Sequence, residues 1–247
     1  MTQKTFSYLF YGLFILIGAL SIGFVPGALS YPYGSAIAIC IISLPLVVAL
    51  YKNFGLQKTV LSFLVLSLFA LAIEYTGLVT GWPYGHFEYT GELGARIFGI
   101  LPWTVGFSWT PLMLGAVAMV YPFTKSKTLR ILLPVVILVV FDLLLDPVAV
   151  SVGMWQFAEQ GAYYGVPFRN FVGWGISGLI GSQISYLLFV KAPARAMASL
   201  GISFYISIAL WTLVALFRGL YIPFAIGLVL SVLVAVIHYR YAKNSGN

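Results

Sequence analysis

Residues 130–149 read RILLPVVILVVFDLLLDPVA, a run of 20 residues that is apolar apart from Arg130 at its start and two acids, Asp142 and Asp146. A helix that crosses a bilayer needs about 20 apolar residues, so this segment is long enough to span one. Seven more stretches of comparable character occur along the chain: 6–26, 35–51, 57–80, 103–122, 171–190, 198–217 and 221–239. The sequence therefore predicts an all-α integral membrane protein, a polytopic bundle of about eight transmembrane helices that forms a single domain over residues 1–247.

The composition of the whole chain agrees with this prediction. Of its 247 residues, 61% are hydrophobic and 8% are charged, and the mean hydropathy is +1.01. A soluble domain carries about 25% charged residues, and a disordered chain is more charged and less hydrophobic. The single cysteine, Cys40, excludes an intrachain disulfide. The basic residues behind the net charge of +7 are scattered, which argues against a nucleic-acid partner.

Basic residues fall mainly on one side of the predicted bundle. If the N-terminus is cytoplasmic and eight helices alternate, the cytoplasmic segments hold ten of them: Lys4, Lys52, Lys58, Lys125, Lys127, Arg130, Lys191, Arg195, Arg240 and Lys243. The outer segments hold Arg96, Arg169 and Arg218. Cytoplasmic loops of membrane proteins are enriched in Lys and Arg, so this bias predicts that both termini are cytoplasmic.

Three acidic residues, Glu74, Asp142 and Asp146, lie inside the predicted spans. All three fall in the outer halves of their helices, beneath two long external segments, Gly81–Pro102 and Ser151–Asn170. An ionisable group at membrane depth is costly and by default marks a functional site. The sequence has no phosphate-binding loop and no metal-binding motif, so the expected chemistry needs acids and water, with no cofactor and no metal.

Asp142 and Asp146 are four residues apart, so they lie on one helix face about a turn from each other. Two carboxyl groups that close in apolar surroundings are not both expected to ionise, so one should keep its proton. Pro147 cannot donate a backbone hydrogen bond, and it is expected to kink the helix or end it at Asp146. These features are typical of a general acid held in a lipid-facing or aromatic cavity.

Tryptophans gather on the same side of the predicted bundle. Those in its outer half or outer loops are Trp82, Trp103, Trp109, Trp155 and Trp174. Tryptophan is common at membrane interfaces, but rings clustered beside acids also suit an aromatic lining that holds an apolar substrate and stabilises a carbocation. Arg169 and Asn170, at the mouth of the helix predicted over 171–190, are candidates to hold an acid or a water molecule.

Four segments in this part of the chain resemble the carotenoid-biosynthesis hydratases, the gamma-carotene and bisanhydrobacterioruberin hydratases of bacteria and archaea. The segments are Asp142–Pro147, Gly153–Trp155, Tyr163–Pro167 and Asn170–Trp174. A group of earlier residues resembles the other signature of that family: Glu74, Gly77, Thr80, Gly81, Gly85, Leu101, Pro102 and Trp109. The resemblance covers about residues 70–175 and implies a multi-pass protein of a prokaryotic cell membrane.

The resemblance implies addition of water across the terminal 1,2 double bond of an acyclic carotenoid, one similar to lycopene, gamma-carotene or bisanhydrobacterioruberin. Protonation of that alkene leaves a tertiary cation, which water captures to give a tertiary alcohol. On this hypothesis Asp142 or Asp146 donates the proton, and the other aspartate or Glu74 activates the water. Arg169 and Asn170 would orient that water or a carboxylate. The substrate site would be lined by Tyr164, Trp174, Trp155, Trp109 and Trp82.

Three other functions are compatible with intramembrane acids. An intramembrane prenyltransferase uses D-x-x-x-D pairs to hold magnesium and a diphosphate, but this chain has one such pair and no second acidic cluster. A carotenoid cyclase protonates the same end group and quenches the cation internally, so its product keeps the mass of the substrate. A proton-coupled transporter would place acids along a path across the bilayer, whereas here they concentrate in one half.

Overall fold

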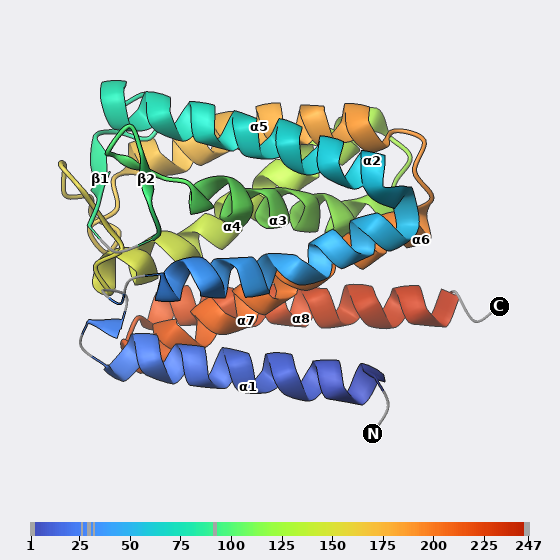
Figure 1. Ribbon diagram of the computed structural model, residues 1–247, viewed down its shortest axis with the longest axis horizontal. Helices are drawn as coiled ribbons and strands as arrows, with labels where there is room; N and C mark the ends of the chain where they lie inside the picture. Colours follow the sequence, from blue (N-terminus) through green and yellow to red (C-terminus); the bar gives the residue numbers. More distant parts are fainter. Residues whose placement is uncertain (1–2, 26, 29–30, 32, 91–92, 245–247) are drawn as a thin grey trace.

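The computed structural model describes the chain except residues 1–2, 26, 29–30, 32, 91–92 and 245–247, and the side chains of residues 3–4 and 238–244 are also outside the described part (Figure 1). The helices are α1 (Gln3–Phe24), α2 (Gly34–Thr80), α3 (Thr104–Val120), α4 (Lys127–Ser151), α5 (Phe168–Phe189), α6 (Ala194–Ala198), α7 (Ile202–Phe217) and α8 (Tyr221–Asn244). Short 3-10 helices are η2 (Tyr121–Phe123) and η3 (Ser199–Gly201). The strands are β1 (Phe87–Tyr89), β2 (Arg96–Ile97), β3 (Leu101–Pro102) and β4 (Trp155–Phe157).

Helices dominate this architecture, and most of them are long and apolar. Within the described residues, six helical segments are long and apolar enough to cross a membrane, and Tyr221–Ile237 is a shorter apolar helix. The strands are two or three residues long and form two separate two-stranded sheets. The predicted all-α membrane protein is therefore confirmed.

The helices predicted over 35–51 and 57–80 are the two halves of α2, with no loop between them. A continuous helix of 47 residues would be about 70 Å long, more than twice the thickness of the hydrocarbon core. Gly55 breaks it, with φ 78° and ψ 173°, a backbone conformation that residues other than glycine rarely adopt. The two halves consequently run in opposite directions along the long axis of the molecule (Figure 1).

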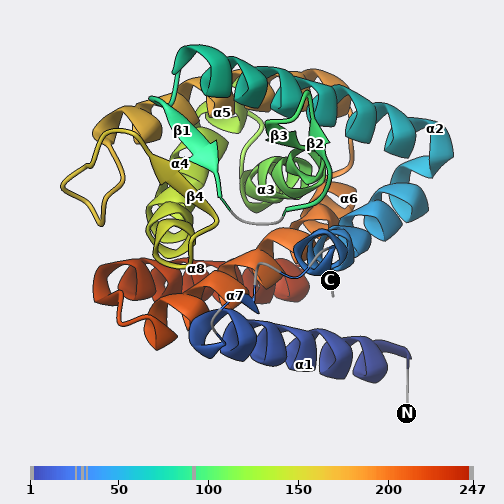
Figure 2. The same cartoon turned by 60° about the vertical axis from the view of Figure 1, so that its left-hand side comes forward.

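Helix α3 forms the centre of the bundle, with α2, α4, α5 and α7 around it (Figure 2). In the most apolar 18 residues of the segment that begins with α3, 89% of the residues are buried. The corresponding share for α1, which packs mainly on α7, is 11%. Gly115 allows the close approach of α7, because a Cβ atom there would lie 2.1 Å from the Cβ of Phe204. Small residues at such crossings are typical of membrane helix packing.

Four prolines lie inside long helices, and each leaves one backbone carbonyl without its helical N–H donor. In three cases a side-chain hydroxyl from another element donates to that carbonyl. The sets of proline, carbonyl and hydroxyl are Pro45, Ile41 and Tyr11 (3.4 Å); Pro111, Phe107 and Ser43 (2.7 Å); and Pro147, Leu143 and Tyr163 (2.9 Å). Near Pro134 the Ser182 hydroxyl donates to the Ile131 carbonyl at 2.8 Å and lies 3.5 Å from the Arg130 carbonyl. Hydrocarbon offers no water to satisfy these carbonyls, so the hydroxyls stabilise the prolines where they stand.

Pro147 was expected to kink helix α4 or to end it at Asp146, and the second alternative is wrong. The helix continues through Pro147 to Ser151, because the Tyr163 hydroxyl takes the place of the missing N–H donor to the Leu143 carbonyl. Asp142 and Asp146 therefore remain one helical turn apart on a regular helix.

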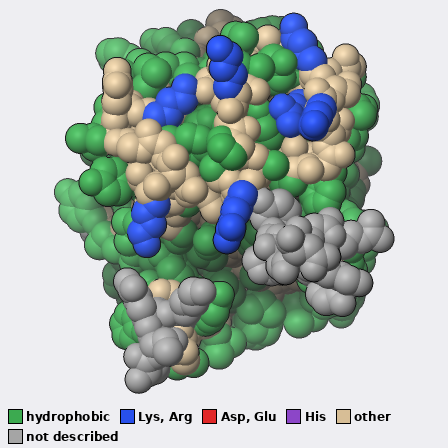
Figure 3. All heavy atoms as spheres, turned by 90° about the vertical axis from the view of Figure 1, so that its right-hand side faces the viewer, with side chains coloured by type: hydrophobic (Ala, Val, Ile, Leu, Met, Phe, Trp, Pro, Cys, Tyr) green, Lys and Arg blue, Asp and Glu red, His purple; other side chains and the backbone are tan. Residues whose placement is uncertain are grey.

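The two ends of the bundle differ in charge. α1 begins and α8 ends at the right-hand end in Figure 1, and Lys and Arg side chains gather on that end in Figure 3. They come from the bend of α2, from the start of α4 and the connection before it, and from α6 and the connection that leads to it: Lys52, Lys58, Lys125, Lys127, Arg130, Lys191 and Arg195. The strands lie at the opposite end, with Arg96, Arg169 and Arg218. The side chains of Lys4, Arg240 and Lys243 are outside the described part.

We expect Ser43→Ala to lower the free energy of unfolding by about 1 kcal/mol, because it leaves the Phe107 carbonyl unpaired in an apolar environment. In a Pro111→Ala background residue 111 regains an N–H donor for that carbonyl, so the cost of Ser43→Ala should fall. Unfolding of the four proteins in detergent measures this double-mutant cycle, and strictly additive effects would contradict the pairing. Ser62→Ala is the control, since the Ser62 hydroxyl donates only to Lys58 within its own helix.

Candidate active site

The two long segments Gly81–Pro102 and Ser151–Asn170 pair with each other through strands β1 and β4. Phe87 lies opposite Phe157, and Tyr89 lies opposite Trp155. Because side chains alternate along a strand, these four rings share one face of the sheet. On the other face Gln156 donates a hydrogen bond to Glu88, opposite it in the register. The sheet is thus aromatic on one side and polar on the other, and the aromatic side faces a cavity.

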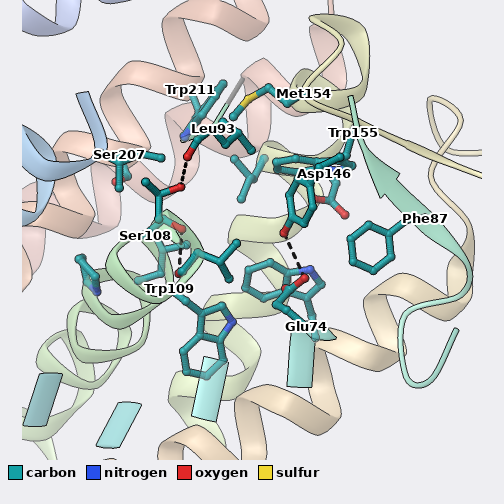
Figure 4. A pocket seen from close by; sticks show the side chains of 18 of the residues that line it. Glu74, Phe87, Leu93, Ser108, Trp109, Asp146, Met154, Trp155, Ser207 and Trp211 are labelled. Atoms are coloured by element: carbon teal, nitrogen blue, oxygen red, sulfur yellow. Dashed lines mark hydrogen bonds between the residues drawn. The ribbon is translucent and has the colours of Figure 1, made fainter. Parts of the chain in front are cut away.

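This cavity encloses about 980 Å³ of empty space, part of it open to the outside. Its wall is mostly apolar and aromatic, and it includes all four rings of the β1–β4 sheet. In Figure 4, Glu74 and Asp146 lie at one end and Ser108 and Ser207 at the other.

A pair of buried carboxyl groups meets one amide at the acidic end. Asn170, near the start of α5, donates from Nδ2 to Oδ2 of Asp142 at 3.0 Å and also to Oδ2 of Asp146. All three residues are buried, with at most 3% of each exposed. Asp146 and Asn170 line the cavity, whereas Asp142 lies one turn behind and is not part of the wall. The sequence alone left the two aspartates equivalent, and the structure distinguishes them.

Glu74, on the second half of α2, belongs to a separate hydrogen bond. The Tyr89 hydroxyl donates to its Oε2 at 3.1 Å, shown by the dashed line at Glu74 in Figure 4. The Tyr89 ring packs edge-on against Trp155 and Phe87, and Arg96 donates to its backbone carbonyl at 3.0 Å. Burial and the Glu74 carboxyl raise the pKa of Tyr89 well above its usual range, so Tyr89 keeps its proton and acts as a donor.

The structure gathers most of the predicted site residues around this cavity. Those that line it are Glu74, Asp146, Asn170, Trp109, Trp155 and Trp174. Asp142 reaches the site through the Asn170 amide. Arg169 and Trp82 are exposed to the outside, and Tyr164 packs on Tyr163; none of these three lines the cavity.

Several cavity residues were not foreseen from the sequence, chiefly Tyr84, Phe87, Tyr89 and Phe157. The pattern that could have indicated Phe87, Tyr89 and Phe157 is the alternation in Phe-Glu-Tyr at 87–89 and Trp-Gln-Phe at 155–157, which is typical of half-buried strands. Each strand has only three residues, so this signal is weak until the two are seen to pair.

Comparison with known proteins identifies the family of this chain. A sequence model of the family described as carotenoid biosynthesis protein matches residues 32–234. The chain belongs to this family. It is also 31% identical over 235 residues to the bisanhydrobacterioruberin hydratase of Haloarcula japonica, an alignment that covers 88% of this chain and 78% of that protein. No solved structure matches the chain. The resemblance found in the sequence is confirmed, and the matched range includes every residue that lines the cavity.

Gly173 of α5 provides a test of how tightly the site is packed. A Cβ atom at Gly173 would lie 2.5 Å from Cδ1 and 3.0 Å from Cα of Tyr84, which lines the cavity. We expect Gly173→Ala to lower the free energy of unfolding by about 1–3 kcal/mol, because the backbone of residue 84 must shift. The control is Gly175→Ala, where a Cβ atom meets nothing within 4 Å, and where we expect no loss. Thermal unfolding in detergent measures both, and equal effects would contradict the packing described.

Proposed function

We propose that this protein is a carotenoid hydratase, which adds water to the terminal 1,2 double bond of an acyclic carotenoid. The observation that carries the proposal is a buried carboxyl pair, Asp142 and Asp146, at the end of an aromatic cavity in a membrane protein. Membership of the carotenoid biosynthesis family and the hydratase relative support it. Carotenoids dissolve in the bilayer, so their end groups can reach such a cavity without crossing water.

In this proposal Asp146 is the proton donor, because it faces the cavity and Asp142 does not. The two neighbouring aspartates share one proton, and Asn170 donates a hydrogen bond to Oδ2 of each. When Asp146 protonates the less substituted alkene carbon, a C–H bond forms, the π bond breaks and a tertiary cation remains. The pair is then left with one more negative charge, which the two N–H groups of Asn170 stabilise.

The walls of the cavity serve the cation that this step creates. The faces of aromatic rings attract positive charge, by about 0.5–2 kcal/mol for each well-placed ring. Trp174 and the four rings of the β1–β4 sheet, Trp155 among them, line the same cavity as Asp146 and Glu74. An apolar wall also limits the number of water molecules near the cation, so capture by one bound water competes well with side reactions.

The arrangement in the membrane follows from the two ends of the bundle. The two halves of α2, the five other long helical segments and the shorter apolar segment Tyr221–Ile237 of α8 make eight crossings, with the basic end and both termini in the cytoplasm. The site then lies in the outer half of the cell membrane. Arg169, Tyr164 and Trp82 are not part of the proposed site, since they do not face the cavity.

Co-expression with the enzymes that make lycopene tests this function. We expect a new pigment heavier than lycopene by one water for each hydrated end, detected by mass spectrometry. A new pigment with the mass of lycopene would instead identify a cyclase and contradict the proposal. Unchanged lycopene in cells that contain the folded protein would contradict the proposal for this substrate. Gamma-carotene and bisanhydrobacterioruberin, which also have acyclic ends, are then the carotenoids to supply.

Removal of the acid tests the assignment of Asp146. We expect Asp146→Asn to lower the amount of hydrated product by about 100-fold or more, because an amide has no acidic proton to give. Asp142→Asn should lower the amount of product too, because Asp146 then has no second carboxyl group with which to share a proton. The matched control is Glu159→Gln, the same change at an exposed outer residue, which should leave the yield unchanged. Full activity in both aspartate variants would show that another group is the acid.

A further inference from the structure

We propose, on the basis of the hydratase function above, that Tyr89 is a positioning residue that makes Glu74 the base for the attacking water. The three buried carboxyl groups would then have two distinct tasks. The aspartate pair gives the proton, and Glu74, held by Tyr89, receives one from water.

The hydrogen-bond donors divide the carboxyl groups in this way. Asn170 uses both of its amide hydrogens on the aspartate pair. Glu74 lies on a different helix, and within the described residues its side-chain hydrogen bond comes from Tyr89. A phenol that keeps its proton favours a charged acceptor, because hydrogen bonds to an ionised carboxylate are stronger than those to a neutral acid. Glu74 is thus suited to accept a proton.

Tyr89 is held in place independently of this hydrogen bond. Its backbone lies in the register between β1 and β4, its carbonyl accepts from Arg96, and its ring packs against Trp155 and Phe87. The hydroxyl occupies Oε2 of Glu74 and leaves Oε1 for a water molecule in the cavity. Removing the hydroxyl alone should therefore leave the ring in position and change only the behaviour of Glu74.

The capture step balances without any further reactant. The oxygen of water forms a bond to the tertiary carbon of the cation, one O–H bond of that water breaks, and Glu74 takes the proton. Tyr89 keeps its own proton throughout. Before the next turnover the proton on Glu74 returns through water to the aspartate pair, so the sum is alkene plus water to alcohol.

Separate tasks mean that protonation can continue when capture fails. In Tyr89→Phe the aspartate pair still protonates the alkene, but the cation more often loses a proton again before water adds. In D₂O the donated particle is a deuteron, so the recovered substrate gains deuterium at the former alkene carbon or a neighbouring position. A purely structural role for Tyr89 would not produce this exchange without hydration.

The experiment supplies lycopene to the purified protein in detergent made up in D₂O and follows two masses, those of the hydrated product and of the recovered lycopene. For Tyr89→Phe we expect hydration to fall about tenfold or more, deuterium exchange to stay near the wild-type rate, and KM to be unchanged. Glu74→Gln, which leaves the β1–β4 sheet untouched, should show the same split. The control is Tyr75→Phe, which changes the residue next to Glu74 on α2, outside the cavity wall, and should alter neither rate.

Each result separates this inference from the proposed function. Wild-type hydration in Tyr89→Phe would overturn the role of Tyr89, and equal loss of hydration and exchange in both Tyr89→Phe and Glu74→Gln would overturn the division of tasks. If Tyr89→Phe does not fold, Glu74→Gln decides the division on its own. Absence of hydration by the wild-type protein would overturn the proposed function itself, and this inference with it.

Discussion

Every backbone carbonyl of this protein that lies in hydrocarbon needs a donor from the protein itself, and this constraint shapes the bundle. The four helical prolines would each leave a carbonyl unpaired, and hydroxyls of Tyr11, Ser43 and Tyr163 satisfy three of them. These contacts also hold the bundle together, because each one joins two elements that are separate in the chain. The contact from Tyr163 matters most for the site. It keeps α4 helical through Pro147, and so keeps Asp142 and Asp146 on one regular helix.

The same constraint applies to the buried acids, whose donors also come from the protein. Asn170 serves the two aspartates, and Tyr89 serves Glu74, so each carboxyl group has a donor although none of the three is paired with a basic side chain in the described part of the chain. Neutral donors leave the carboxyl groups free to exchange protons, whereas a neighbouring Arg or Lys would hold them ionised. A site that must give a proton and take another is better built with an amide and a phenol than with ion pairs.

Much of the site could be predicted from the sequence because an acid inside an apolar span is costly. That argument alone identified Glu74, Asp142 and Asp146, and position along the helix indicated Asn170 as a partner. The tryptophans were harder to assign from the sequence, because tryptophan is common both at the membrane interface and in the wall of an aromatic cavity. Trp109, Trp155 and Trp174 line the cavity, whereas Trp82 is 47% exposed. Tyr89 was missed because its strand is three residues long and can be recognised only beside β4, where Trp155 lies opposite Tyr89.

Hydrophobicity, charge and residue spacing are local properties, and by themselves they determined that this chain is an all-α membrane protein with acids near one end of the bundle. They also carried the family resemblance, because rare residue types at fixed spacings survive in the sequence itself. Which aspartate faces the cavity, which acid receives the Tyr89 hydroxyl and what covers the site were decided only by the tertiary structure. The physical reason is that a hydrogen bond such as that from Asn170 to Asp142, 28 residues apart, depends on how two helices pack and on the rotation of each about its axis.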